Sequence, residues 1–119
     1  MGLFPKGLDQ LEEAADLERL PRNASKMYAI SFDLDTNVLK QMYPNPSWEN
    51  AYADIKRFLK KHGFSWQQGS VYFGGPSVNA VTCVTTVQAL SQKYPWFKVA
   101  VSDLRMLRIE DLNDLSPVL

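Results

Sequence analysis

The sequence is poor in the residues that build disulfide frameworks and zinc centres. Among 119 residues there is one cysteine, Cys83, and one histidine, His62. A single cysteine cannot form a disulfide within its own chain, and structural zinc sites draw their four ligands mainly from cysteine and histidine. These scarcities argue against a disulfide-stapled secreted scaffold and against a zinc site within one chain.

The chain also lacks a net charge and a long apolar run. Thirteen basic residues balance thirteen acidic ones, so a nucleic-acid-binding surface would have to be a local patch. No apolar run approaches the roughly 18 residues of a membrane span, and the N-terminus lacks the basic-then-apolar pattern of a signal peptide. We therefore expect a cytoplasmic protein that does not associate with a membrane.

Length and composition predict one globular domain with an N-terminal extension. Hydrophobic residues make up 45% of the chain and charged residues 22%, as in ordinary soluble domains. We expect residues 27–119 to form the domain. Residues 1–26 would form an extension in which residues 9–20 are a short acidic helix that Pro21 ends. This extension either has little role or docks its acidic helix on a basic surface.

The stretch from Met27 to Asp35 predicts a strand with one core face. Side chains alternate between the two faces of a strand with a period of two. One face would carry Tyr28, Ile30, Phe32 and Leu34, and the other Ala29, Ser31 and Asp33. Two small residues and a carboxylate would let a substrate approach the backbone closely. Asp33 is then either a catalytic carboxylate or an exposed residue leading into a turn.

Apolar residues recur at helical spacing from about residue 47 to residue 62, which predicts an amphipathic helix. Ser47 is the expected N-terminal cap and Gly63 the expected C-terminal cap. Two short strands, residues 64–67 and 70–73, would form a hairpin around a tight turn. The late polar positions of the helix are basic, which either favours the helix dipole or attracts phosphate.

Residues 78–93 are ambiguous in sequence. Their β-branched composition suits a strand, but their length and the spacing of their apolar residues favour a helix capped by Ser77. Cys83 would be a small buried residue there and not a nucleophile. Residues 94–97 are expected to be a loop with aromatic anchors, and residues 98–109 to contain the last strand.

The resulting order of elements predicts an α+β fold, a ferredoxin-like βαββαβ sandwich. Two helices would cover one face of a four-stranded antiparallel sheet with strand order 4-1-3-2. The end of the first strand would then lie beside the starts of the third and fourth, which brings together Asp33, Ser70 and Asp103. If Val71 faces the helices, Ser70 and Tyr72 share the open face with Asp33.

An open sheet face in a small protein is commonly covered by dimerisation. We therefore expect a homodimer in which Asp33 of one chain approaches Asp33 of the other; a higher oligomer is the alternative. Paired carboxylates can hold Mg²⁺ or another divalent cation over a phosphodiester, or share a proton as acid and base. Alternatively the face is only a dimer interface with acids at its polar rim.

Three stretches of the sequence together resemble a known family. They are Met27-Tyr28-Ala29-Ile30-Ser31-Phe32-Asp33-Leu34, Gly63-Phe64 with Gln68-Gly69-Ser70-Val71-Tyr72, and Trp96-Phe97 with Val101-Ser102-Asp103-Leu104-Arg105 and Arg108-Ile109-Glu110-Asp111. Through them residues 27–119 resemble the virulence-associated protein D family, small bacterial endoribonucleases often found in toxin–antitoxin contexts. The family shares its fold with the small CRISPR-adaptation nucleases, whose Gln-x-Ser-Val-aromatic stretch is matched by residues 68–72.

This resemblance implies a ferredoxin-like dimer that cleaves RNA, with an antitoxin protein as a further possible partner. It places Asp33 in the essential-carboxylate position and Ser70 beside it. Two departures are clear. Residues 1–26 have no counterpart in the typical family member, and Leu112-Asn113-Asp114-Leu115 stands where the family has aromatic-Ser-Asp-Phe.

The function expected from the sequence is therefore RNA phosphodiester hydrolysis. Asp33 would activate the attacking oxygen, with Ser70 orienting a phosphate or the carboxylate, and Asp103, Arg105 and Tyr72 in support. Candidates to attract the RNA backbone are Lys56, Arg57, Lys60, Lys61, Arg105 and Arg108. Tyr72 and the tryptophans are candidates to stack unpaired bases, although Trp66 and Trp96 also suit a core. The alternative is a non-catalytic dimer that acts as a regulatory or nucleic-acid-binding module.

Overall fold

The computed structural model describes residues 27–119, so the expected acidic helix of residues 9–20 lies outside the described part. Residues 27–108 form one compact unit, to which the segment from Ile109 onward does not belong. The elements are β1 (Met27–Leu34), α2 (Thr36–Met42), α3 (Asn50–Lys61), β2 (Phe64–Gln68), β3 (Val71–Gly74), α4 (Ala80–Lys93), α5 (Pro95–Ala100), β4 (Val101–Ile109) and a 3₁₀ turn, Ser116–Val118.

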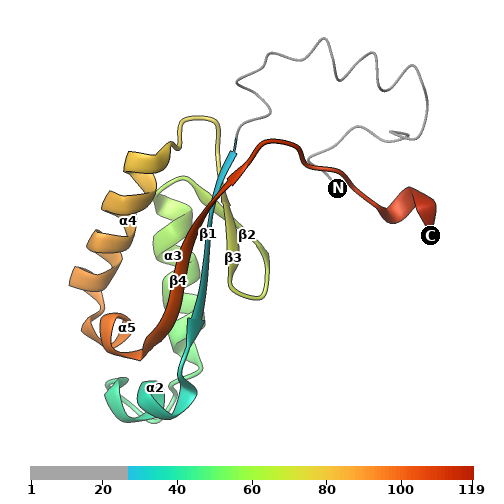
Figure 1. Cartoon of the computed structure of the whole chain (residues 1–119). Coiled ribbons are helices and arrows are strands. Elements are labelled where there is room, and N and C mark those ends of the chain that lie inside the picture. The colour runs from blue at the N-terminus through green and yellow to red at the C-terminus, as the bar shows by residue number, and fades with distance from the viewer. Residues whose placement is uncertain (1–26) are drawn as a thin grey trace. The chain divides into compact units, whose positions relative to one another are not determined.

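The sheet has the topology that the sequence predicts. Its strand order is β2-β3-β1-β4, the expected 4-1-3-2 order read from the other edge. β3 pairs antiparallel with both β1 and β2. The helices α3 and α4 lie on one side of the sheet, as Figure 1 shows. The predicted ferredoxin-like α+β sandwich is confirmed.

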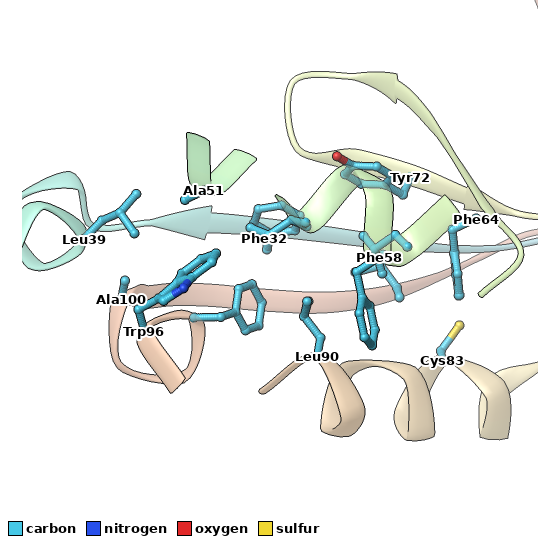
Figure 2. Packing of buried hydrophobic residues seen from close by; sticks show 14 of the residues in the cluster. Phe32, Leu39, Ala51, Phe58, Phe64, Tyr72, Cys83, Leu90, Trp96 and Ala100 are labelled. Carbon is cyan, nitrogen blue, oxygen red and sulfur yellow. The ribbon is translucent and has the colours of Figure 1, made fainter. Parts of the chain in front are cut away.

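The core lies between the sheet and the helices and is built largely from aromatic and aliphatic side chains. Ile30 and Phe32 are 2% and 3% exposed, which confirms the core face of β1. Figure 2 shows Phe32, Phe58 of α3 and Leu90 of α4 within this cluster. Burying each side chain of this size contributes roughly 1.5–3 kcal/mol, so the strand is held mainly by its apolar face.

The helix α3 begins later than the sequence predicts. Ser47 does not cap it; its N–H instead donates to Asn45 Oδ1 at 2.8 Å, and the helix starts at Asn50. The side chain of Asn45 thus forms a turn of its own before the helix, a competing local structure typical of this residue type. At the other end Gly63 has φ +91° and its N–H donates to Lys60 O, so the predicted glycine cap is confirmed.

The ambiguous segment is a helix, α4, as predicted. Cys83, Thr86 and Leu90 are buried on one side of it, so helical packing outweighs the β-branched composition. Its cap is Asn79 and not Ser77, because Asn79 and Thr82 bond to each other's backbone N–H in a capping box.

The segment expected to be a loop is in fact the start of a short helix, α5. Pro95 occupies its first turn, where a missing N–H costs no hydrogen bond, and Trp96 and Phe97 are buried against the core. A second short helix, α2, follows β1, and its N-cap is Asp35, whose Oδ1 accepts from Asn37 N at 2.9 Å. Both helices fill the end of the core with side chains that a loop would leave exposed.

None of the helices within residues 27–119 is long and apolar enough to cross a membrane.

Candidate active site

Three strands converge where the central strand β1 ends, at the end of the sheet that we call the Asp33 edge. The N–H of Phe32 donates to Ser70 O at 3.2 Å, which places the residue before β3 beside the end of β1. On the other side the hydroxyl of Ser102, near the start of β4, donates to Asp33 O at 3.3 Å. The predicted meeting of these strand ends is confirmed. Figure 1 shows the end of β1, the β2–β3 turn and the start of β4 towards the same end of the sheet.

Asp33 is exposed at this edge and does not point into the core. Its negative charge nevertheless reaches α3. Burial, and after it the charge of Asp33, raise the pKa of the Tyr52 phenol in the first turn of α3. The carboxylate is therefore open to solvent and lies within electrostatic range of the first turn of α3.

The faces of Ser70 and Tyr72 differ from the prediction. Tyr72 pairs with Ile30 of the core face, is 3% exposed and stacks on Phe32 with ring centroids 6.1 Å apart. Alternation puts Ser70 on the same, helix-covered side, while Val71 lies opposite Ser31. The expectation that Ser70 and Tyr72 share the open face was wrong, because Val71 and Phe73 are as apolar as Tyr72 and the pattern fits either face.

Asp103 and Arg105 form an ion pair with each other on β4. The guanidinium Nε lies 3.1 Å from both carboxylate oxygens, and both side chains are partly or largely exposed. Counted from Val101, which packs against the core, alternation places both residues on the helix side. Their shared face is as predicted, but it is not the face of Asp33. Such an exposed pair contributes little to stability, about 0–1 kcal/mol.

A pocket of about 370 Å³ opens between α3 and the β2–β3 hairpin, beside this edge. Trp66 Nε1 donates to Gly69 O at 2.7 Å, and Lys56 Nζ lies 4.5 Å from the centre of the indole. The residues that line the pocket are Tyr52, Lys56, Trp66, Gly69, Ser70 and Tyr72. Tyr52 was not among the site residues predicted from the sequence. Its spacing of four residues from Lys56 was the available signal.

The basic candidates on α3 are spread along the helix. Lys56 lines the pocket, whereas Arg57 is paired with Asp54 one turn earlier. Lys60 and Lys61 are exposed roughly 6–8 Å further along the helix. They approach the end at Gly63, opposite to the Asp33 edge. Lys56 is thus the cation of α3 that lines the pocket, one turn after Tyr52.

The remaining candidates divide between core and surface. Trp96 is 5% exposed and Tyr72 3%, so neither offers a ring face to a base. Trp66 is 47% exposed. Arg108 is exposed near the end of β4 and has interactions of its own. Among the aromatic candidates for base stacking, Trp66 therefore presents the most accessible ring.

The described residues do not form a cation cage within one chain. Nowhere in residues 27–119 do three or more His, Cys, Asp or Glu side chains gather closely enough to hold a metal ion. Mg²⁺ is usually held by one or two carboxylates together with waters and substrate phosphates. Asp33 is therefore a single candidate ligand and not part of a cluster of three or more such side chains within the described residues.

Known proteins resemble the chain across the whole domain, although no family model matches it. Endoribonuclease VapD 2 of Riemerella anatipestifer is 55% identical over 93 residues, which are 78% of this chain and 99% of that protein. The endoribonuclease VapD homolog of Helicobacter pylori is 56% identical over 93 residues, 78% and 96% of the two chains. Endoribonuclease VapD of Dichelobacter nodosus is 41% identical over 92 residues, 77% and 96%. The resemblance inferred from the motifs is confirmed, and the chain belongs to the VapD family.

Proposed function

We propose that this protein is an endoribonuclease that cleaves RNA phosphodiester bonds in the cytoplasm, with Asp33 as its essential carboxylate. The observation that carries the proposal is the position of Asp33. It is an exposed carboxylate at the Asp33 edge, where Ser70 and the start of β4 meet the end of β1. Ser70 also lines the pocket that contains Lys56. The endoribonuclease names of the relatives support the same activity.

In the proposed reaction Asp33 acts as a general base. Its carboxylate takes the proton from the attacking oxygen, either a water or the ribose 2′-hydroxyl, which forms a new bond to phosphorus. The P–O bond to the leaving ribose oxygen breaks, and that oxygen takes a proton from solvent water. Ser70 and Lys56 lie on the helix-covered side and Asp33 on the other, so the phosphate would be bound beyond the end of β1, where both sides of the sheet are accessible. There the hydroxyl of Ser70 would donate a hydrogen bond to a phosphate oxygen, and the ammonium of Lys56 would offset the phosphate charge. Positioned acid–base groups accelerate such steps by roughly 10²–10⁴-fold.

We further propose that the protein acts as a homodimer. β4 is a nine-residue edge strand with three large apolar side chains at least 39% exposed, Leu104, Met106 and Leu107. Long apolar edge strands tend to pair with another chain. Light scattering coupled to size exclusion tests this: Met106→Lys should shift a dimer toward monomer, whereas a monomeric parent would contradict it.

The cleavage experiment compares the full chain with Asp33→Asn and Asp35→Asn on one defined single-stranded RNA. Asp33→Asn should lower kcat/KM by at least about 100-fold. Asp35→Asn should cleave normally, because an asparagine oxygen can cap α2 as Asp35 does. Circular dichroism checks that both variants are folded. Equal cleavage by Asp33→Asn and the parent would contradict the proposal and favour a non-catalytic binding module or a contaminating nuclease.

Two further arms define the chemistry. Substitution of 2′-deoxyribose at the cleaved position abolishes cleavage if the 2′-hydroxyl is the nucleophile and leaves it intact if water attacks. Cleavage that survives EDTA would show that the mechanism needs no divalent cation.

A chain starting at Met27 tests the extension. Activity equal to that of the full chain would show that residues 1–26 do not inhibit cleavage.

A further inference from the structure

The exposed tryptophan of β2 is held in a fixed orientation. Trp66 lies on the edge strand and is 47% exposed, yet its Nε1–H donates to Gly69 O at 2.7 Å across the hairpin turn. Gly69 itself has φ +51°, a left-handed conformation that suits glycine and shapes this turn. A large exposed apolar ring that is orientated by a hydrogen bond is better suited to binding a ligand than a freely rotating one.

The chemistry of the surrounding pocket is mixed. Tyr52 and the largely buried Tyr72 join Trp66 in its lining, and Lys56 and Ser70 are its polar residues. Its volume of about 370 Å³ is near the lower end of the roughly 300–1,000 Å³ common for ligand pockets. The pocket is therefore suited to one small, flat ligand that carries a negative charge.

The pocket is joined to the proposed catalytic edge through two of its lining residues. The carbonyl of Ser70 accepts from Phe32 N, the residue before Asp33. Burial, and after it the charge of Asp33, raise the pKa of the Tyr52 phenol in the same lining. The pocket therefore opens at the end of the sheet that carries Asp33, on the helix-covered side.

We propose that this pocket binds one unpaired nucleobase of the RNA next to the cleaved phosphodiester, with Trp66 as the stacking platform and Lys56 as the phosphate contact. The inference rests on the proposed function, because it names the part of the RNA that the Asp33 site recognises. Lys56 lies over the indole at 4.5 Å. Its flexible stem lets the ammonium move to a phosphate while the base takes its place on the ring.

The shape and chemistry favour an unpaired base over a duplex or a free anion. Bases within a duplex are stacked on one another and do not present a free face to a side chain. A site for phosphate alone would need cations and backbone N–H groups, not an exposed indole. We therefore expect selectivity for single-stranded RNA that depends on the ring of residue 66.

Binding is measured on the full chain carrying Asp33→Asn, so that the RNA stays intact. The probe is a fluorescently labelled single-stranded RNA of about 12 nucleotides, within the range that such surfaces cover, read by anisotropy. Adding Trp66→Ala should weaken binding by about 5- to 100-fold, the usual effect of removing one stacking ring. Trp66→Phe should restore most of it, which a merely structural role of the hydrogen bond to Gly69 would not.

The chain provides a matched control for Lys56. Lys40 Nζ lies 5.3 Å from the ring centre of Trp48, a second lysine–tryptophan pair outside the pocket. Lys56→Ala should weaken RNA binding and lower the slope of log K against log salt by about 1, as expected for one lost phosphate contact. Lys40→Ala should change neither.

The outcomes separate this inference from the proposed function. Unchanged binding by a folded Trp66→Ala variant, equal binding of the matching duplex, or competition by inorganic phosphate as strong as by adenosine monophosphate would each overturn it. Loss of binding in Trp66→Ala without any RNA cleavage by the parent would support the pocket and overturn the proposed function. Cleavage that needs Asp33 but not Trp66 would support the proposed function and overturn the assignment of the pocket to a nucleobase.

Discussion

The main-chain N–H of Phe32 donates to the carbonyl oxygen of Ser70 at 3.2 Å, so the backbone itself fixes Ser70 beside Asp33. This bond does not involve the serine side chain. The position of residue 70 is therefore set independently of its hydroxyl, and substituting the side chain tests the hydroxyl alone.

Ser70→Ala should reduce cleavage while leaving the sheet intact. A hydrogen bond to a charged group is worth roughly 1.5–3 kcal/mol, which corresponds to a loss in kcat/KM of about 10- to 100-fold. Steady-state kinetics on the defined RNA measures the loss, and thermal unfolding checks the fold. The control is Ser65→Ala, since Ser65 lies in β2 and its hydroxyl contacts only its own hairpin. Equal activity of both variants would remove Ser70 from the reaction.

Gly74 at the end of β3 should not tolerate a side chain. A Cβ there would lie 2.6 Å from Cγ1 and 2.7 Å from Cβ of the buried Val78, whose short side chain cannot swing away. We expect Gly74→Ala to lower the free energy of unfolding by about 1–3 kcal/mol, measured in urea.

Gly75→Ala is the matched control for this prediction. The nearest atom to a Cβ at Gly75 is Gly63 O at 3.5 Å, an ordinary contact. Its effect should remain within about 0.5 kcal/mol. If the two alanine variants were equally stable, the close packing of Val78 on Gly74 would be contradicted.

Tyr43 stabilises the fold in a way that depends on pH. Its hydroxyl donates to Asp54 Oδ2 at 2.6 Å, and this hydrogen bond, together with burial, raises its pKa to about 12. The pKa in the unfolded chain is about 10. A folded-state pKa above the unfolded one gives stability that is complete below pH 10 and is lost as the pH rises towards 12.

Tyr43→Phe should therefore cost about 1 kcal/mol at pH 8, with a smaller difference from the parent above pH 10. Urea unfolding of both proteins at pH 8 and pH 11 measures this. Asp54 keeps its contact with Arg57 in the variant, so no carboxylate is left without a partner. A stability difference that stayed constant or grew with pH would contradict the assignment.

The thiol of Cys83 should be protected in the folded protein. The residue is 2% exposed, and burial raises the pKa of its thiol, which disfavours the reactive thiolate. We expect a disulfide exchange reagent to label it at least about a thousandfold more slowly in buffer than in denaturant, because reaction requires opening of the fold. Rapid labelling of the native protein would show that α4 does not bury this face.

Several features of the fold were predictable because one residue pattern fits only one arrangement. The alternation of β1 defined its core face, and Gly63 ended α3 as expected. The topology followed from the order of elements, and the motif match indicated the family. The caps were less predictable, since Asn45 and Asn79 offered side-chain bonds that competed with the expected serines.

The sequence by itself determined the fold class, the family and the presence of Asp33 at the end of a central strand. Only the tertiary structure decided that Tyr72 and Ser70 face the helices, and that Tyr52, Lys56 and Trp66 surround one pocket. The physical reason is that β3 is apolar on both faces, so its pattern does not define which face packs inward. Contacts between a helix and a hairpin depend on how the two pack together, and no local pattern encodes that packing.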